Sequence, residues 1–310
     1  MRAFIAGHNG MVGSALIKLA PSNIDLITIN HSELDLRDEE KVMSFLHRNK
    51  PELLILAASK VGGISANSRM QKDFLLENLM IQNSVMNSAL LNGVHTLIFL
   101  GSSCIYPRLA AQPISEKSLL TGQLEPTNEG YALAKIVGVK LCNAISSEND
   151  MNYFSLMPTN LYGPNDNFSL EDGHVPAALM RRFHEAKIGG HLSVKVWGSG
   201  KPQREFMHVD DLANACWFLA KKNLGGELIN VGTGVDIGIA EFAKLMASVV
   251  GYTGKIEFDS SKPDGSPRKL LDVSKVHSLG WQHKIRLEEG LSTTYKWFTD
   301  ALEKGEVRGY

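Results

Sequence analysis

Three glycines spaced three residues apart follow the first apolar run of the chain. The segment Gly7-His8-Asn9-Gly10-Met11-Val12-Gly13 comes directly after Ala3-Phe4-Ile5-Ala6 and opens a stretch of helical length. Glycines at this spacing allow a tight turn, a close approach of backbone to a pyrophosphate, and close packing of a helix on a strand. Because the turn needs a strand before it and a helix after it, the chain is constrained to begin with a βαβ unit. We expect Gly7, Asn9, Gly10, Met11, Val12 and Gly13 to contact a dinucleotide there.

Short apolar runs alternate with helix-length stretches through the first half of the chain. Strands buried on both faces of a sheet have continuous runs of Val, Ile, Leu and Phe. Such runs occur at residues 3–6, 26–29, 53–56 and 97–100, with helical stretches at 11–19, 39–49, 73–92 and 131–147. This order predicts an α/β fold, a Rossmann-like doubly wound parallel sheet with right-handed crossovers.

The alternation stops between Pro158 and Arg204, where prolines, glycines and polar residues accumulate. Residues 209–222 again have a helical pattern, and residues 228–231 have that of a strand. We therefore expect the chain to leave the sheet, return to it and leave it again. The predicted dinucleotide-binding domain is 1–160 plus about 205–235, and a smaller C-terminal α/β substrate lobe is about 161–204 plus 236–310.

Charge and cysteine usage exclude several classes of function. Lysine and arginine number 32 against 33 acidic residues, so no strong field favours nucleic acid or a membrane surface. The three cysteines have no metal-binding spacing, which predicts no metal site and a reducing, cytoplasmic setting. The first expected strand begins at Arg2, leaving no room for a cleavable signal, and no apolar run approaches the ~18 residues of a membrane span.

The segment after the second expected strand bears on the choice of dinucleotide. An acid there commonly binds the ribose hydroxyls of NAD, whereas this chain has Asn30-His31-Ser32. No carboxylate stands at that place to repel a 2′-phosphate, although Glu33 and Asp35 follow and no arginine is present to clamp the phosphate. We therefore expect NADP(H), with NAD left open as the alternative.

A tyrosine and a lysine four residues apart supply groups for reduction. Tyr131 and Lys135 fall on one face of an expected helix, and Ser102 follows the fourth expected strand, at the carboxyl edge where ligands bind. A phenol has a reference pKa of about 10, and a cation beside it is expected to bring this pKa toward neutrality. Lys135 can also hold the nicotinamide ribose, and Ser102 can hydrogen-bond a substrate carbonyl.

With the glycine loop upstream, this arrangement resembles the extended short-chain dehydrogenase/reductase family. The resemblance covers nearly the whole chain, since Arg204-Glu205-Phe206-Met207-His208-Val209-Asp210-Asp211 and Asn230-Val231-Gly232-Thr233-Gly234 look like later motifs of its sugar-nucleotide branch. Two further segments, Gly101-Ser102-Ser103-Cys104-Ile105-Tyr106-Pro107 and Pro158-Thr159-Asn160-Leu161-Tyr162-Gly163-Pro164 with His174 following, resemble the GDP-L-fucose synthases.

The resemblance implies an NADP(H)-dependent enzyme that acts on a GDP-sugar. Cys104 and His174 would exchange protons at C3 and C5 of GDP-4-keto-6-deoxymannose, and Ser102, Tyr131 and Lys135 would then direct hydride to the C4 ketone. Cys104 can serve as a thiolate base if nearby cationic groups stabilise the thiolate. Cys142 and Cys216, amid apolar neighbours on expected helices, are assigned to packing.

The resemblance also implies binding residues. Further cofactor contacts would be His31, Ala57, Ala58, Tyr131, Lys135, Pro158, Asn160 and Leu161, and substrate contacts Asn160, Val175, Arg182, Trp197, Arg204 and Lys269. Arginine suits a diphosphate because its planar fork donates two hydrogen bonds at once. The chain departs from its relatives at Asn9 and His31, roughly where NADP-using members carry arginines. That departure puts the strength of the cofactor contact in doubt.

Other functions remain open on the sequence alone. A related sugar-nucleotide 4-epimerase or 4-ketoreductase would need no inversion at C3 and C5, and a dinucleotide-sensing regulator would need no turnover. The helices expected at 73–92 and 131–147 resemble those that pair across a four-helix interface in this family, which implies a homodimer.

Overall fold

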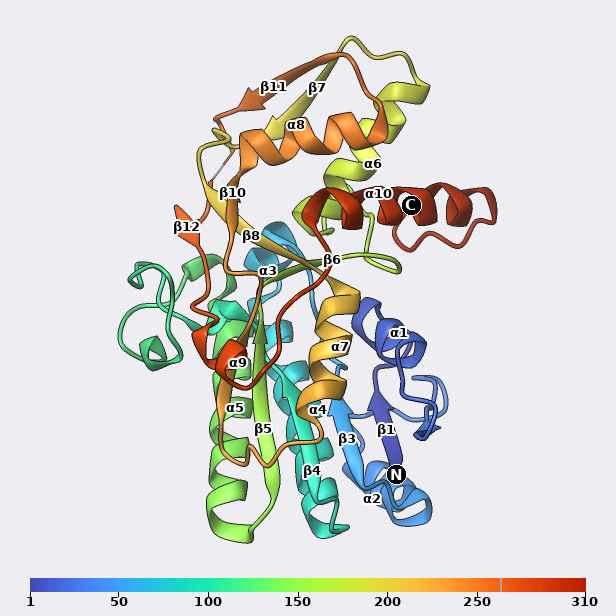
Figure 1. The fold of residues 1–310 in the computed structure, drawn as a ribbon, viewed down its shortest axis with the longest axis vertical. Helices are drawn as coiled ribbons and strands as arrows, with labels where there is room; N and C mark the ends of the chain where they lie inside the picture. Colours follow the sequence, from blue (N-terminus) through green and yellow to red (C-terminus); the bar gives the residue numbers. More distant parts are fainter. Residues whose placement is uncertain (263) are drawn as a thin grey trace.

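The computed structural model describes residues 1–262 and 264–310, arranged as a lower and an upper lobe in Figure 1. The lower lobe contains a sheet of six strands, all paired in parallel, in the order β2-β1-β3-β4-β5-β9. These strands are β1 (Arg2–Ala6), β2 (Asp25–Ile27), β3 (Leu53–Leu56), β4 (Thr96–Leu100), β5 (Asn152–Pro158) and β9 (Leu228–Val231). The order of strands runs from β1 to β2 in one direction and from β1 through β3 to β5 in the other, so the sheet is doubly wound. The predicted fold class is therefore confirmed.

Helices cover both faces of this sheet. On one face lie α2 (Glu39–Asn49), α4 (Gln71–Leu91) and α5 (Glu129–Asn149), and on the other lie α1 (Met11–Lys18) and α7 (Val209–Leu219) (Figure 1). The short helix α3 (Ile64–Arg69) precedes α4. Helix α2 begins at the residue expected because the Asp38 carboxylate accepts a hydrogen bond from the Lys41 amide. The helices expected at 11–19, 39–49, 73–92 and 131–147 all form, with ends shifted by two residues or fewer.

The upper lobe is built from segments that leave the main sheet after β5. One sheet joins β6 (Asn160–Tyr162), β8 (Gln203–His208), β10 (Asp236–Gly238) and β12 (Arg268–Lys269), and a second pairs β7 (Ser193–Trp197) with β11 (Lys255–Asp259). Helices α6 (Val175–Ile188), α8 (Ile239–Val250) and α10 (Leu287–Glu303) pack with them, and α9 (Ser274–Ser278) lies against β9. Between β4 and α5 the chain forms three 3₁₀ turns, η1 (Ser103–Ile105), η2 (Glu116–Ser118) and η3 (Pro126–Asn128).

Each lobe has its own apolar core. The lower core includes Phe4, Leu54, Ile98 and Phe154, and the upper core is rich in aromatic rings, among them Phe183, Phe242 and Phe298. We propose that these two cores correspond to the two interleaved domains expected from the sequence. The chain passes between them at Pro158, around His208 and again after Val231, which brings segments distant in sequence to the junction of the lobes.

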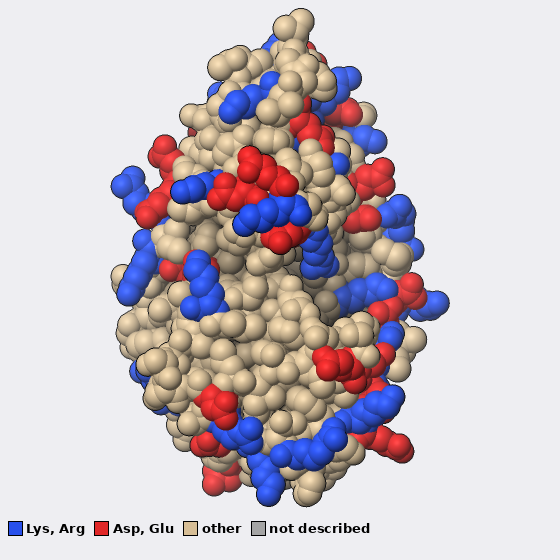
Figure 2. All heavy atoms as spheres, turned by 90° about the vertical axis from the view of Figure 1, so that its right-hand side faces the viewer, with Lys and Arg blue, Asp and Glu red and all other residues tan. Residues whose placement is uncertain are grey.

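The surface carries charges of both signs. Lysine and arginine are interspersed with aspartate and glutamate over both lobes on the face seen in Figure 2. Among the helices that the structure describes, none combines the length and apolar character required to cross a membrane.

Candidate functional site

The glycine loop joins β1 to α1, and its three glycines present backbone without side chains. Gly7 has a φ of +94°, and a Cβ there would lie 2.6 Å from the Ala58 backbone nitrogen. A Cβ on Gly13 would meet the carbonyl of Gly7, so helix α1 packs closely on the loop. At Gly10, by contrast, a Cβ would meet only the Gly7 carbonyl at 3.6 Å, so this residue faces open space at the N-terminus of α1. A dinucleotide pyrophosphate fits there because the helix end offers amide donors to an anion.

The segment after β2 is tied to this loop by two asparagines. The Asn9 side chain donates to Asn30 Oδ1 at 3.0 Å, and Asn30 Nδ2 donates to the Glu33 carboxylate at 2.9 Å. A carboxylate therefore lies one hydrogen bond behind the place where an acid binds ribose hydroxyls in NAD enzymes. His31 is exposed beside this chain of contacts.

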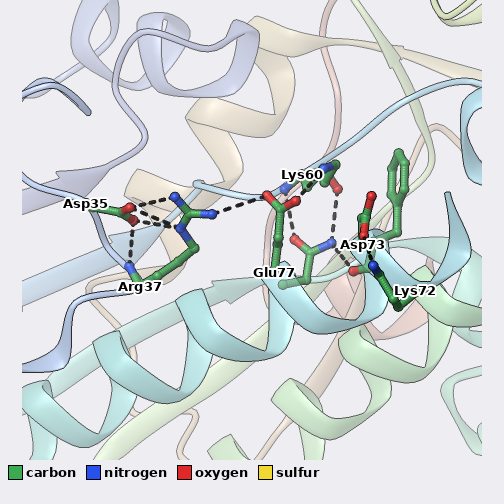
Figure 3. Close-up of polar contacts among 8 residues, drawn as sticks. Asp35, Arg37, Lys60, Lys72, Asp73 and Glu77 are labelled. Atoms are coloured by element: carbon green, nitrogen blue, oxygen red, sulfur yellow. Dashed lines mark hydrogen bonds and ion pairs between the residues drawn. The ribbon is translucent and has the colours of Figure 1, made fainter.

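An arginine between β2 and α2 was not part of the sequence-based prediction. Arg37 follows the loop, and its guanidinium donates to Asp35 at 2.6 Å and lies 3.8 Å from Glu77 on α4, which also pairs with Lys60 (Figure 3). The hydrogen bond from Arg37 lowers the pKa of Asp35 to about 2. These ion pairs tie Arg37 to the loop and to α4, so its charge is already balanced by two carboxylates.

Ser102, Tyr131 and Lys135 meet at the carboxyl end of β4. The Tyr131 hydroxyl lies beside Ser102 and beside Ser59, which follows β3. Lys135 is 3% exposed, and its ammonium donates to the Leu100 carbonyl at 2.8 Å and lies 5.7 Å from the centroid of the Tyr131 ring. Burial lowers the pKa of Lys135 to about 7.

The expected effect of Lys135 on the phenol is wrong for this structure. Burial raises the pKa of Tyr131, and the negative charge of Cys104 raises it further, while the neighbouring Ser59 and Ser102 hydroxyls only partly offset these effects. The physical reason is that the ammonium is bound to a backbone carbonyl and lies over the Phe99 ring, 4.8 Å from its centroid, instead of bonding the phenol oxygen.

Two residues behind Tyr131 were missed by sequence reasoning. Ser59 donates to Asn78 Oδ1 at 2.6 Å, and the same oxygen accepts from the Lys60 amide at 2.9 Å. The Asn78 amide group donates to the Lys60 and Phe74 carbonyls, and the side chain is 2% exposed. A polar residue on the buried side of α4 was the available signal. Asn78 thereby fixes the segment that holds the Tyr131 hydroxyl.

Cys104 lies in η1, two residues after Ser102. Ser102 caps this turn, accepting from the Cys104 amide at 3.3 Å. The sulfur accepts from Asn128 Nδ2 at 3.2 Å and from the Lys269 ammonium at 3.7 Å. Desolvation lowers the pKa of Arg204, and the charge of Cys104 acts on the same guanidinium in the opposite direction. The predicted residues Cys104, Arg204 and Lys269 therefore lie together, with Asn128 as an unpredicted neighbour.

His174 precedes α6 on the side of the upper lobe. Its Nδ1 lies 3.4 Å from Asp166 Oδ1, and 41% of its side chain is exposed. Desolvation lowers the pKa of His174, but the hydrogen bond and charge of Asp166 outweigh this effect, so the net pKa is raised. Among the described residues no hydrogen bond joins His174 to Cys104 directly, and its common site with the thiol stays a prediction.

The other predicted binding residues lie in three groups. Ala57 and Ala58 follow β3 beside the glycine loop, and Pro158 and Leu161 lie where the chain passes from β5 to β6. Asn160 donates to the Glu205 carbonyl at 2.8 Å. Arg182 lies 5.8 Å from the centroid of the half-exposed Trp197 ring, and Val175 is exposed at the start of α6. These groups come from both lobes.

Glu205 is a second residue that sequence reasoning passed over. Its side chain is fully buried in the Arg-Glu-Phe segment of β8, and its carboxylate accepts from the amides of Thr233, Gly234 and Leu271 at 2.5, 2.8 and 3.0 Å. A buried carboxylate needs such partners. This one ties β8 to the loop after β9 and to the chain just beyond Lys269.

Comparisons with known proteins identify the family of the chain. The family model described as the NAD dependent epimerase/dehydratase family matches residues 3–232. The chain is 54% identical to putative GDP-L-fucose synthase 2 of Arabidopsis thaliana, over 96% of this chain and 92% of that one. It is 50% identical to GDP-L-fucose synthase of Escherichia coli, over 98% of both chains. A crystal structure of a GDP-L-fucose synthetase from Naegleria fowleri bound to NADP matches with a TM-score of 0.89 and 26% identity, over 98% of this chain and 96% of that one.

Proposed function

Because the chain belongs to the NAD dependent epimerase/dehydratase family and within it to the GDP-L-fucose synthases, we propose that it converts GDP-4-keto-6-deoxy-D-mannose to GDP-L-fucose with NADPH. The observation that carries the proposal is that the groups for epimerisation and the groups for reduction lie together. Cys104 lies in the same turn as Ser102 and acts electrostatically on Tyr131, so a base for epimerisation and an acid for reduction occupy one site.

Epimerisation requires that protons next to the C4 ketone be removed and returned on the opposite face. Cys104 takes the proton from C3 or C5, forming an S–H bond while the C–H electron pair moves toward the ketone oxygen. Hydrogen bonds from Ser102 and Tyr131 to that oxygen stabilise the resulting enolate. His174, whose pKa Asp166 raises, returns a proton from the other face.

Reduction uses the same ketone oxygen. Residues of the glycine loop would hold NADPH, which would supply the hydride for C4. Tyr131 donates the proton that converts the C4 oxygen to a hydroxyl, and its high pKa suits a group that must stay protonated until then. Ser59 and Ser102 orient the phenol, and Lys135 lies on the same helix one turn further on.

The nucleotide part of the substrate is assigned to the upper lobe. Arg204 and Lys269 carry positive charge at the lobe junction. Arg182 lies beside Trp197 in the upper lobe. An arginine fork pairs with a diphosphate, and an aromatic face stacks on a planar base. Asn160 and Val175 complete the proposed substrate contacts.

We further propose that the protein is a homodimer paired through α4 and α5. Leu76 and Met80 on α4, and Leu133 and Val137 on α5, are each at least 40% exposed and stand four residues apart on their helices. Apolar side chains at this spacing form a stripe that a second copy can cover. The three cysteines are unpaired, which suits the reducing cytoplasm that we propose as the compartment.

The test of the function is identification of the sugar product in deuterated water. The protein is incubated with GDP-4-keto-6-deoxy-D-mannose and NADPH, and the product is analysed by mass spectrometry and NMR. GDP-L-fucose with deuterium at C3 and C5 is expected, and Cys104→Ser should block this incorporation far more than it slows NADPH oxidation.

Other outcomes separate the alternatives. A reduced sugar without inversion at C3 and C5 would identify a 4-ketoreductase, and NADPH binding without oxidation would identify a dinucleotide-sensing protein. Either result would contradict the proposed function.

A further inference from the structure

A pair of cations faces the thiol of Cys104 from the upper lobe. In the parallel pairing of β12 with β8, Lys269 is the direct partner of Arg204. Directly paired residues project from the same face of a sheet, so both side chains point to the same side. The Lys269 ammonium lies 3.7 Å from the sulfur, and Arg204 lies within range of its charge.

We propose that Lys269, supported by Arg204, stabilises Cys104 as a thiolate before substrate binds and so makes it the base of the epimerisation. This inference rests on the proposed function. It gives Lys269 a role beyond the substrate contact implied by its relatives, because the reacting sulfur itself is within hydrogen-bond distance.

The donors around the sulfur fit the charged form of the thiol. A thiolate accepts hydrogen bonds, and here two donors, Lys269 Nζ and Asn128 Nδ2, converge on it from different segments. An ammonium this close to the sulfur favours a negative charge there, and it does so more strongly where water is excluded. Thiolates of reactive cysteines are held in such electropositive, partly exposed surroundings.

The strand that carries Lys269 is anchored on both sides of it. Arg268 forms an ion pair with Asp236, and the amides of Leu270 and Leu271 donate to Gln112 and to the buried Glu205. The ammonium is therefore set in place by the fold, without requiring a bound phosphate. Because β12 belongs to the upper lobe, that lobe supplies the charge that faces the thiol of Cys104.

The proton balance follows from this arrangement. The resting thiol gives its proton to solvent, the thiolate then takes a proton from C3 or C5, and the new S–H proton is lost to solvent before the next exchange. Lys269 remains an ammonium throughout. Deuterium enters the sugar from His174, which exchanges its own proton with the solvent and returns it to the carbon.

The experiment measures the thiolate directly, without substrate. Alkylation of Cys104 by neutral iodoacetamide is followed against pH by mass spectrometry, which separates it from the buried Cys142 and Cys216. Lys269→Met should reduce the alkylation rate at neutral pH about tenfold, since the thiolate and not the thiol reacts. Lys269→Arg, which keeps the charge, should restore most of the rate.

A control and a second signal make the result decisive. Lys304→Met removes the same charge at an exposed site after α10 and should leave the rate unchanged. The pH-dependent ultraviolet absorbance of the thiolate, measured against Cys104→Ser, should move to higher pH in Lys269→Met. An unchanged alkylation profile and absorbance in folded Lys269→Met would overturn the proposal even if the protein makes GDP-L-fucose. Failure to make that product would contradict the function and leave these thiol measurements valid.

Discussion

His174 and Asp166 form a pair in which the imidazole Nδ1 lies 3.4 Å from the carboxylate, next to the N-terminus of α6. The carboxylate is 4% exposed and also accepts from the Asn167 amide at 2.7 Å. Its charge raises the pKa of His174 against the opposing effect of burial. We therefore expect Asp166→Asn to lower the pKa of His174, so the protonated acid is lost at lower pH.

The measurement is the pH profile of deuterium incorporation at C3 and C5. In Asp166→Asn the alkaline limb of the profile should move to lower pH, with the plateau rate at acidic pH largely retained. Asp172→Asn, which removes an exposed carboxylate paired with Arg69, is the control and should leave the limb in place. An alkaline limb at the wild-type position in Asp166→Asn would show that His174 is not the titrating acid.

The contact between Asn78 and Ser59 predicts a positioning role for a residue that does not touch substrate. Asn78→Ala removes the acceptor of Ser59, so the serine can turn away from Tyr131. We expect kcat for reduction to fall by about tenfold to a hundredfold, as small displacements of catalytic groups commonly do. Deuterium incorporation by Cys104 and His174 should fall much less.

A merely structural role for Asn78 would give a different result. If reduction and deuterium incorporation fell equally, and KM fell for neither substrate, the positioning role would be contradicted. Asn78→Asp keeps the oxygen that accepts from Ser59 and should rescue part of kcat. Asn87→Ala on the exposed side of the same helix is the matched control.

Much of the lower lobe could be predicted from local patterns. The runs Leu53–Leu56 and Thr96–Leu100 are buried strands because both faces of a parallel sheet are covered by helices, which leaves no polar face to interrupt the run. The upper lobe could not be predicted in this way. Its strands β6, β10 and β12 have three residues or fewer and are defined by pairing with distant segments, for which a local pattern carries no signal.

The same difference between local patterns and distant contacts applies to the candidate site. Tyr131 and Lys135 are neighbours through helix geometry alone, so their spacing predicts their proximity. The bond from Lys269 to Cys104 spans 165 positions, and that between Asn128 and Cys104 depends on the path of η3. The pKa of Tyr131 was predicted in the wrong direction because spacing on a helix says nothing of the Leu100 carbonyl that binds the lysine.

The buried ammonium of Lys135 predicts a dependence of stability on pH. Its pKa falls from 10.5 to about 7 on folding because burial disfavours the charged form. Between these values the unfolded chain binds the extra proton, so this lysine contributes full stability above its unfolded pKa, and the contribution is lost as pH falls through its folded pKa. Relative to Lys135→Met, the wild-type protein should lose up to about 1.4 kcal/mol of unfolding free energy per pH unit across this window.

Urea unfolding without added cofactor, from alkaline to neutral pH, measures this difference. Lys140→Met, at an exposed position on the same helix, should follow the wild-type curve. A constant difference between wild type and Lys135→Met over the whole window would contradict a buried ammonium with a lowered pKa.

The contacts of Asn9, Asn30 and Glu33 predict only modest discrimination between NADPH and NADH. The carboxylate of Glu33 lies behind Asn30, and Arg37 is bound to Asp35 and Glu77. Asn9→Arg should therefore tighten NADPH by about tenfold relative to NADH, since a cation near the ribose pairs with a 2′-phosphate. Nicotinamide fluorescence gives both Kd values. Asn223→Arg adds the same charge at an exposed distant site, and an equal change for NADPH and NADH in Asn9→Arg would place the 2′-phosphate elsewhere.

The exposed stripes on α4 and α5 predict that a charge on each should separate the proposed dimer. In the double variant Leu76→Arg with Val137→Arg, two arginines would have to be buried without partners, at a cost of several kcal/mol each. Sedimentation velocity should then show a monomer at concentrations where we expect the wild-type protein to be a dimer. Leu192→Arg is the control, because Leu192 is 89% exposed in the upper lobe and its replacement should leave the dimer intact. A dimer that persists in the folded double variant, or one broken by Leu192→Arg, would place the interface on another surface.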